Sequence, residues 1–442
     1  MATRFTRRDL VRLAAASGMG VSLGGLAASQ RAVAGATVDG TSARIVAGKV
    51  IQPERELPVL NQTDVLVVGG GPAGVSAAIA ARRTGAKVAL VERYGHLGGL
   101  WTGGFVVLVI GHRVGDLQVS RGIGEEMMQR LERLDRGICR RGPGEDPVVD
   151  VESLKYVLVD MITEAQVDVF MHCWGVDAIM DGNAVRGAVF ESKSGRQAIL
   201  AKVVIDTTGD GDLYAAAGAE HENRPCRASL LYRVGNLDKL PPSLKPDMPK
   251  HLRNAYPVEG VTWNAIHSPE IDGLDVKELS NLELKARKAL WKRMQETRQT
   301  PGYESLYVID TAPQLGIRVT RVLNGEATIT AEDHRTGRKF PDVVAVGGVT
   351  GRDGAKLVAT GPWQVPYGAL VPRKLENLLT AGRCISFEKK MADLVRLIPN
   401  CWTTGQAAGV AAAVAAQEQC APRNVNISKV QAILRQQGAY LG

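Results

Sequence analysis

The sequence predicts an α/β fold with a parallel sheet and an inserted α+β domain. Two patterns predict it. Short apolar runs of the kind found in buried parallel strands cover residues 64–68, 87–91 and 201–205, and alanine-rich helical stretches lie between or after them. The run at 64–68 leads directly into a glycine-rich turn and a helix, as at the start of a strand–helix–strand unit. With 45% apolar and 23% charged residues, the 442-residue chain has the composition of an ordinary globular protein.

The glycine-rich turn, GGGPAG at residues 69–74, predicts a Rossmann-like dinucleotide site. In this reading Gly69 permits the tight turn, Gly71 lets the backbone approach a pyrophosphate, and Gly74 allows the helix to pack closely on the strand. The N-terminus of the following helix offers free N–H groups to phosphate. After the second strand comes Glu92, where a carboxylate can accept hydrogen bonds from a ribose diol.

The segment after Glu92 favours FAD over NAD. A second glycine-rich loop, residues 93–104, begins at once, where a nicotinamide enzyme would continue with another plain βα unit. Its paired glycines would let the backbone run beside an extended cofactor towards a flavin ring. Near the C-terminus, a helix predicted to begin at Gly405 and to end at Ala416 would point its N–H dipoles at the negative region of that ring.

Further motifs extend this pattern. They are the loop Leu97-Gly98-Gly99, the segment TGDGD at 208–212, and the blocks 316–321, 365–372 and 382–409. With these motifs the chain resembles the FAD-dependent oxidoreductases of the glutathione-reductase-like type, in the wider group of fumarate-reductase-type and tRNA-modifying flavoproteins. The resemblance covers roughly residues 62–420. It implies FAD as the cofactor and an adenine contact at Val176. The cofactor-binding residues expected from the motifs and the resemblance together are Gly69, Gly71, Pro72, Ala73, Gly74, Glu92, Arg93, Gly98, Gly99, Trp101, Thr102, Val176, Thr208, Gly209, Asp210, Gly382, Arg383, Gly405 and Ala407.

The same patterns predict the domain organisation. A signal peptide covers residues 1–36 and a lead-in covers 37–60. The FAD-binding domain is expected to combine residues 61–104, 151–220 and 376–442, and the substrate domain residues 105–150 and 221–375. Within them we expect a helix at 151–164, a hairpin at 176–189 and a charged helix at 279–298 with a solvated face.

A flavin enzyme must orient its substrate over the ring and handle one proton, so candidate catalytic residues come from the substrate domain. Arg318 could fix a carboxylate or stabilise developing negative charge, and Arg321 could do so or pair with acids of the protein. Tyr367 could donate a proton, and His334 or His267 could act as a general base. For each of them a structural ion pair or a packed histidine is the alternative. Trp101, Trp363 and Trp402 could wall the flavin or pack in the core.

The N-terminus predicts export. Arg7 and Arg8, followed by a mild glycine-containing apolar run and the small-residue site Ala32-Val33-Ala34, are typical of a twin-arginine signal. We therefore expect a periplasmic or extracellular protein. Residues 1–36 carry +4 of the formal net charge of +8, and no long basic block follows, which argues against nucleic acid. The apolar run is too short and too rich in glycine for a membrane span, so stable membrane insertion is not expected.

The six cysteines contain no CxxC pair, so neither a metal site nor a dithiol redox pair is expected. Because an exported enzyme meets no NADPH pool, we expect a dehydrogenase or oxidase. It would move a hydride from a small-molecule substrate to the flavin and pass electrons to O2, a quinone or a cytochrome. A reductase fed by a redox partner and a non-catalytic flavin protein are the alternatives. The substrate, the mode of FAD attachment and the oligomeric state stay open.

Overall fold

The structure, a computed structural model, describes residues 42–142, 144–348 and 361–442. The chain divides into two compact units, residues 1–56 and 57–442. In the first unit, β1 (Arg44–Val46) and β2 (Lys49–Ile51) form an exposed antiparallel hairpin. The predicted signal peptide at 1–36 lies outside the described residues.

The larger unit is built on a seven-stranded sheet, counted over the described residues. In spatial order its strands are β10 (Trp174–Asp181), β11 (Ala184–Ser192), β12 (Gly195–Asp206), β3 (Val59–Val68), β4 (Val88–Glu92) and β9 (Asp168–Met171), with β20 (Leu378–Thr380) paired to β12. The strands β20, β12, β3, β4 and β9 are parallel to one another, and β10 and β11 add an antiparallel hairpin. The predicted α/β class with a parallel sheet is confirmed.

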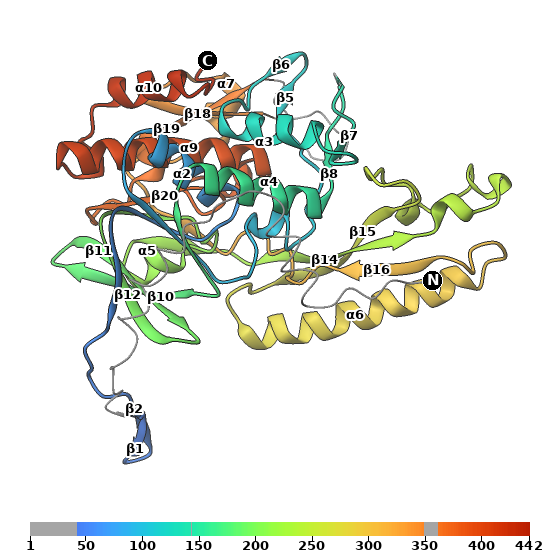
Figure 1. The fold of residues 1–442 in the computed structure, drawn as a ribbon, viewed down its shortest axis with the longest axis horizontal. Coiled ribbons are helices and arrows are strands. Elements are labelled where there is room, and N and C mark those ends of the chain that lie inside the picture. The colour runs from blue at the N-terminus through green and yellow to red at the C-terminus, as the bar shows by residue number, and fades with distance from the viewer. Residues whose placement is uncertain (1–41, 143, 349–360) are drawn as a thin grey trace, which may run out of the picture. The chain divides into compact units, whose positions relative to one another are not determined.

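Among the described residues, five helices lie on one side of this sheet. Alternate residues of β3 point to opposite sides of the sheet, and both sides are buried. Val65 and Val67 pack in the cluster that includes the helices, whereas Leu66 and Val68 pack with Phe190 on the other face. Figure 1 shows the helices gathered above the large sheet. They are α2 (Pro72–Arg83), α3 (Ile123–Glu132), α4 (Val151–Glu164), α9 (Ile398–Glu418) and, packed on α9, α10 (Ile427–Gln436). The other face carries α5 (Asp212–Ala216).

A second, antiparallel sheet has the order β15 (Thr262–Ile271), β14 (Cys226–Gly235) and β16 (Tyr307–Thr311). The helix α6 (Val276–Arg298) lies along it and buries Leu290 and Met294 in a cluster with Tyr232 (Figure 1). Smaller elements are the strand pairs β13 (His221–Asn223) with β17 (Arg321–Leu323), β18 (Val343–Gly347) with β19 (Trp363–Pro366), β5 (Arg113–Val114) with β6 (Leu117–Gln118), β7 (Ile138–Cys139) with β8 (Val148–Val149), and the helices α7 (Ala331–Thr336) and α8 (Ala392–Val395). The predicted domain boundaries stay predictions.

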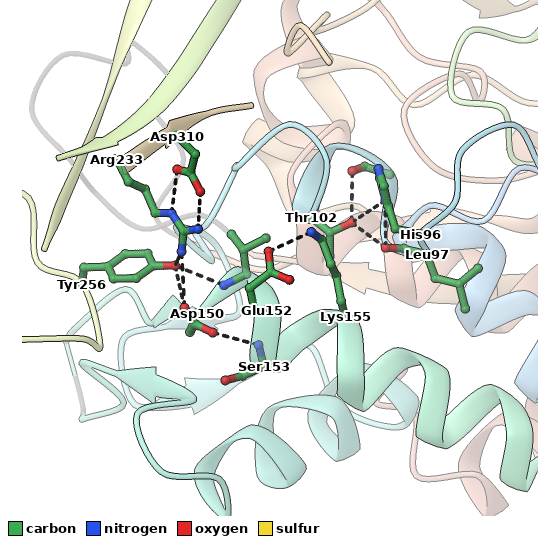
Figure 2. Close-up of polar contacts among 12 residues, drawn as sticks. His96, Leu97, Thr102, Asp150, Glu152, Ser153, Lys155, Arg233, Tyr256 and Asp310 are labelled. Atoms are coloured by element: carbon green, nitrogen blue, oxygen red, sulfur yellow. Dashed lines mark hydrogen bonds and ion pairs between the residues drawn. The ribbon is translucent and has the colours of Figure 1, made fainter. Parts of the chain in front are cut away.

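A buried polar network joins this second sheet to α4 (Figure 2). Arg233 of β14 donates to both carboxylate oxygens of Asp310 (3.0 and 2.5 Å) and to the hydroxyl of Tyr256 (2.6 Å). That hydroxyl donates to Asp150 (2.8 Å) and accepts from the backbone N–H of Val151 (3.2 Å). Asp150 is also the N-cap of α4, since it accepts from the N–H of Ser153 at 2.8 Å.

Local predictions agree well with these elements. The helix at 151–164 has the predicted bounds, and the hairpin turns at 181–184 as expected. The first helix begins at Pro72, one turn before the predicted alanine-rich stretch. In the described part of the chain, no helix is long and apolar enough to cross a bilayer. The six cysteines all lie in that part, and none is paired in a disulfide.

Candidate active site

The glycine-rich turn has the geometry that its sequence predicted. Gly69 has a φ of +103°, and a Cβ there would stand 2.6 Å from the carbonyl oxygen of Thr207. A Cβ on Gly74 would stand 1.8 Å from the carbonyl oxygen of Gly69, so helix and strand meet backbone to backbone. A Cβ on Gly71, in contrast, would meet open space. The turn therefore closes tightly on the protein side and leaves the N-terminus of α2 open on the other.

Glu92 stands beside this turn. Its carboxylate accepts hydrogen bonds from the N–H groups of Gly70 (2.6 Å) and Tyr94 (2.8 Å). Burial raises the pKa of Glu92 above its ordinary value, and the two N–H groups counteract part of that rise. Next to it, the guanidinium of Arg93 lies over the rings of Tyr94 (4.9 Å) and Trp174 (5.4 Å). A carboxylate and an aromatic-backed arginine thus stand where the ribose and adenine were expected.

A cavity of about 550 Å³ extends from this turn to the first turns of α6 and to the segment 313–317. Most of the predicted cofactor residues line it: Gly69, Gly71, Pro72, Ala73, Glu92, Arg93, Gly99, Thr208, Gly209, Asp210, Gly382 and Arg383. Its volume is within the range of small-molecule pockets. The cavity therefore brings together segments that are more than 300 residues apart in the sequence, such as Gly69 and Arg383, as the glycine motifs predicted.

The wall at 208–212 is held by two arginines. Arg383 donates to the carboxylate of Asp210 at 2.6 Å, and Thr320 donates to the same oxygen at 2.9 Å. Burial alone would raise the pKa of Asp210, but the positive charges of Arg383 and Arg93 hold it below its ordinary value. Arg321, a predicted catalytic residue, lines the cavity but donates to Asp212 (2.8 Å) and to the carbonyl of Asp210 (3.0 Å). It holds the loop in place, which was the alternative considered for it.

The predicted start of the C-terminal helix is wrong. The helix α9 begins at Ile398, so Gly405 and Ala407 lie in its interior and do not line the cavity. The glycine serves packing: a Cβ on Gly405 would stand 2.1 Å from the carbonyl oxygen of Ala73 in α2. The N-terminus of α9 does reach the cavity, through Ile398 and Cys401.

Four other predicted cofactor residues, namely Gly98, Trp101, Thr102 and Val176, do not line the cavity. Trp101 is fully buried against Trp402, with ring centroids 5.4 Å apart. Thr102 donates to the carbonyl of Leu97, and the N–H of Gly98 donates to the carbonyl of Gly70 at 2.7 Å. At the adenine end the lining residues are Cys173, Trp174 and Gly175, so Val176 itself is one position away. Core packing, the alternative for the tryptophans, holds for Trp101, Trp363 and Trp402.

The remaining catalytic candidates do not line the cavity either. The hydroxyl of Tyr367 donates to the carbonyl of Pro422 at 2.8 Å, and burial raises its pKa. His334, in α7, packs edge-on against Trp363, and burial lowers the pKa of this histidine. His267 is an exposed residue bonded to Ser229 (2.8 Å). Arg318 is half-buried next to the cavity wall, and its pKa is lowered by burial and then by the charge of Arg396.

Sequence reasoning missed several residues of the wall. Gln314 and Leu315 lie just before the predicted block at 316–321, and Arg396 lies before α9. The first turns of α6 also line the cavity, although we expected that helix only to present a solvated face. The additional lining residues are Leu100, Val276, Leu279, Ser280, Glu283, Ile317, Ile398 and Cys401. The proline-flanked start of the 313–321 segment was a signal that a longer motif continues there.

The cavity fits FAD by its own features. The first turn of α2 carries no acidic residue and no side-chain cap, so nothing of the protein competes with a phosphate there. Buried donor atoms of Arg383 and Gln314, both in the wall, have no hydrogen-bond partner among the described residues. In the same part of the chain there is no cluster of three His, Cys, Asp or Glu side chains that could hold a metal ion.

A model of the family described as "FAD dependent oxidoreductase" matches residues 64–225 and 232–434. The chain belongs to this family. FAD as the cofactor and a flavoprotein enzyme of the oxidoreductase class are thereby confirmed.

Individual relatives are more distant. Thiamine thiazole synthase of Pyrococcus horikoshii is 29% identical over 159 residues, which cover 34% of this chain and 58% of the relative. Dihydrolipoyl dehydrogenase of Trypanosoma brucei brucei is 56% identical over 45 residues, 10% of this chain and 9% of that one. The chain thus spans less than two thirds of these relatives. A geranylgeranyl bacteriochlorophyll reductase-like protein of Thermoplasma acidophilum covers 85% of this chain and 84% of its own, at 16% identity and a TM-score of 0.45.

Proposed function

We propose that this FAD-dependent oxidoreductase is an exported dehydrogenase or oxidase of the glutathione-reductase-like type that oxidises a small organic substrate. The observation that carries the proposal is the cavity, which continues past the glycine-rich turn. Its described lining includes Gln314, Leu315, Ile317, Arg396, Ile398 and Cys401. A mostly apolar wall with a few polar groups is typical of a small-molecule site.

The residues of the turn would hold the cofactor. The N-terminus of α2 would bind the pyrophosphate, and Glu92 would bind the ribose. The loop at 208–212, which Arg383 and Arg321 hold, would contact the part of FAD that links the pyrophosphate to the flavin ring. Bound FAD supplies the redox chemistry by accepting a hydride or two electrons. The protein supplies orientation and exclusion of water around the reacting bond.

The positive charge of an arginine in the cavity wall supports a substrate with an anionic group. Arg396 lines the cavity and is held by Asp393 at 2.6 Å. Arg318 lies close enough for the two guanidinium groups to repel each other, and it makes no ion pair within the described residues. Because Arg396 lines the cavity and a guanidinium can bind a second carboxylate besides Asp393, hydroxy acids and amino acids are the first compounds to test.

The electron acceptor follows from the predicted export. Outside the cytoplasm no pool of NADPH reduces the flavin, so the reduced cofactor would be reoxidised by O2, a quinone or a cytochrome. This part of the proposal rests on the sequence of residues 1–36. Replacement of Arg7 and Arg8 by lysine should retain the protein in the cytoplasmic fraction; normal export of this double variant would remove the localisation.

The decisive experiment is anaerobic bleaching of the bound flavin near 450 nm, a general flavin absorbance, by amines, hydroxy acids, sugars and enones. We expect bleaching by a member of the panel and none by NADPH. Gly71→Val, which should fold without FAD, is the control for bleaching by contaminants. Reduction by NADPH together with no response to the panel would refute the dehydrogenase or oxidase. Rapid reduction by a viologen dye, with oxidised substrate then consumed, would favour a reductase fed by a partner.

A further inference from the structure

One face of the first two turns of α6 borders the cavity instead of the protein core. Val276, Leu279, Ser280 and Glu283 of this helix line the cavity. Their spacing of i, i+3, i+4 and i+7 places the four side chains on one face of the helix. The cavity therefore lies where a helix of a globular protein ordinarily meets its core.

The two halves of α6 differ in burial. The C-terminal half contributes three buried residues to the core: Ala286, Leu290 and Met294. The structure describes all ten residues from Val276 to Lys285, and none of them is buried. Leu279 and Leu282 pack against the core only in part. Because helices in proteins draw most of their stability from the packing of an apolar face, the first half lacks the contacts that hold the second.

Local contacts keep the first half of α6 in position. Asp275 caps the helix by accepting hydrogen bonds from two backbone N–H groups of its first turn, at 2.7 and 3.1 Å. Arg287 pairs with Glu283 and donates to the carbonyl of Ala312 at 3.4 Å, next to the lining residue Pro313. These contacts fix the helix at the edge of the cavity and leave the face towards the cavity uncovered.

The side chains of this face indicate which part of a ligand they can contact. Val276 and Leu279 are apolar, Ser280 offers a hydroxyl and Glu283 a carboxylate, and none of the four is basic. A carboxylate repels phosphate oxygens but accepts hydrogen bonds from O–H and N–H groups. The face therefore suits the ring and hydroxyl-bearing parts of FAD, whereas the N-terminus of α2 suits the pyrophosphate.

We propose that the first half of α6 belongs to the cofactor site: FAD packs on the face formed by Val276, Leu279, Ser280 and Glu283, and the bound cofactor stabilises this half of the helix. One cavity is lined both by this face and by the glycine-rich turn, so a cofactor that fills the cavity contacts both. The inference rests on FAD as the cofactor and not on a particular substrate. It assigns part of the cofactor contact to a helix that the sequence places in the substrate domain.

Hydrogen–deuterium exchange of the full chain, without and with FAD, tests the inference. Amides of a helix exchange when it opens locally, and a ligand that contacts the helix suppresses this opening. We expect residues 279–285 to exchange at least about 10-fold more slowly with FAD, and residues 286–298 to change much less. Equal exchange of the first half with and without FAD overturns the inference. Protection that requires an oxidisable compound besides FAD also overturns it, because the face would then belong to the substrate.

Two pairs of variants test the contact by titration of the apoprotein with FAD. Ser280→Trp adds bulk on the cavity face without removing a packed side chain, so it should weaken FAD binding by about 10-fold or more. Its matched control is Asn281→Trp on the exposed face, which should bind FAD like the wild type. Leu279→Ala should weaken binding by roughly 4- to 15-fold, the effect of one or two buried methylene groups. Leu284→Ala, at a side chain that is 65% exposed and does not line the cavity, should not.

Equal FAD affinities of Ser280→Trp and Asn281→Trp, with both variants folded by circular dichroism, overturn the inference. Should Ser280→Trp fail to fold, the exchange of the wild type decides alone. A wild type that takes up no FAD refutes this inference together with the cofactor assignment. A wild type in which FAD protects α6 but no compound bleaches the flavin supports this inference, while the proposed oxidation fails.

Discussion

Tyr256 is the central residue of the network that fixes the second sheet on α4 (Figure 2), and Tyr256→Phe removes one atom from it. Its hydroxyl takes part in three hydrogen bonds, of which those with Arg233 and Asp150 involve charged groups. The phenyl ring would still fill the space and still contact Arg233. The change therefore isolates the polar contribution of the hydroxyl.

The expected cost can be worked out from these contacts. Hydrogen bonds to charged groups contribute about 1.5–3 kcal/mol each, but Asp150 keeps the N–H of Ser153 and Arg233 keeps Asp310. The N–H of Val151 loses its partner inside the protein. We expect the free energy of unfolding to fall by about 2–3 kcal/mol. With about 2.1 cal/mol/K of unfolding entropy per residue over the unit 57–442, this is a loss of roughly 3 °C in Tm.

Urea unfolding followed by circular dichroism measures the first quantity, and calorimetry the second. Tyr303→Phe is the control, because Tyr303 is also buried but its hydroxyl makes a single long hydrogen bond within the described residues, to the carbonyl of Leu244 at 3.5 Å. That variant should cost less than about 1 kcal/mol. Equal losses in the two variants would show that the hydroxyl of Tyr256 in its network contributes no more to stability than the single long hydrogen bond of Tyr303.

Three further predictions concern the cofactor site and pH. Gly71→Val should fold but bind no FAD, because its side chain enters open cavity, whereas Gly74→Ala should be poorly folded, because its Cβ meets backbone; equal folding yields would contradict this. Glu92→Gln should weaken FAD binding by roughly 10-fold in a direct titration, since an amide cannot accept from both N–H groups and the ribose; unchanged affinity would refute the role. Burial, with Arg141 and Arg113, lowers the pKa of His112 to about 4. Its stabilising effect is thus present above pH 6.5 and lost towards pH 4, by up to about 3 kcal/mol, and denaturant titrations of His112→Leu should show a flatter pH profile.

The sequence was most informative where local chemistry decides the structure. Gly69 is required because its φ is positive, and Gly74 is required because another backbone segment approaches it closely. A glycine-rich turn that follows a strand predicts both features. Asp150 precedes an amphipathic stretch as an N-cap should, and the predicted helix at 151–164 has the observed bounds. The positive φ of Gly69, the approach of Gly74 to the carbonyl of Gly69 and the Asp150 cap involve near neighbours in the sequence, although Thr207 of a distant segment also packs against the turn.

Predictions failed where a residue serves a distant contact. Gly405 looks like the start of a helix, yet it is an interior residue that lets α9 approach α2. Pro399, at the first turn of α9, was the better signal for the helix start. The hydroxyl of Tyr367 donates to a backbone carbonyl 55 residues away, and nothing in the local sequence distinguishes that role from catalysis. Gln314 has no pattern of its own, and only the fold places it in the wall.

The close approach of α9 to α2 has a consequence for biosynthesis. The glycines of α9 contact the carbonyl groups of Ala73 and Ala77, so the helix that follows the phosphate-binding turn is packed against a helix synthesised more than 300 residues later. A nascent chain ending before residue 398 would have the complete glycine-rich turn but no partner for the helix that carries it. Cofactor capture should therefore wait until α9 has been synthesised, and chains truncated before residue 398 should emerge without flavin.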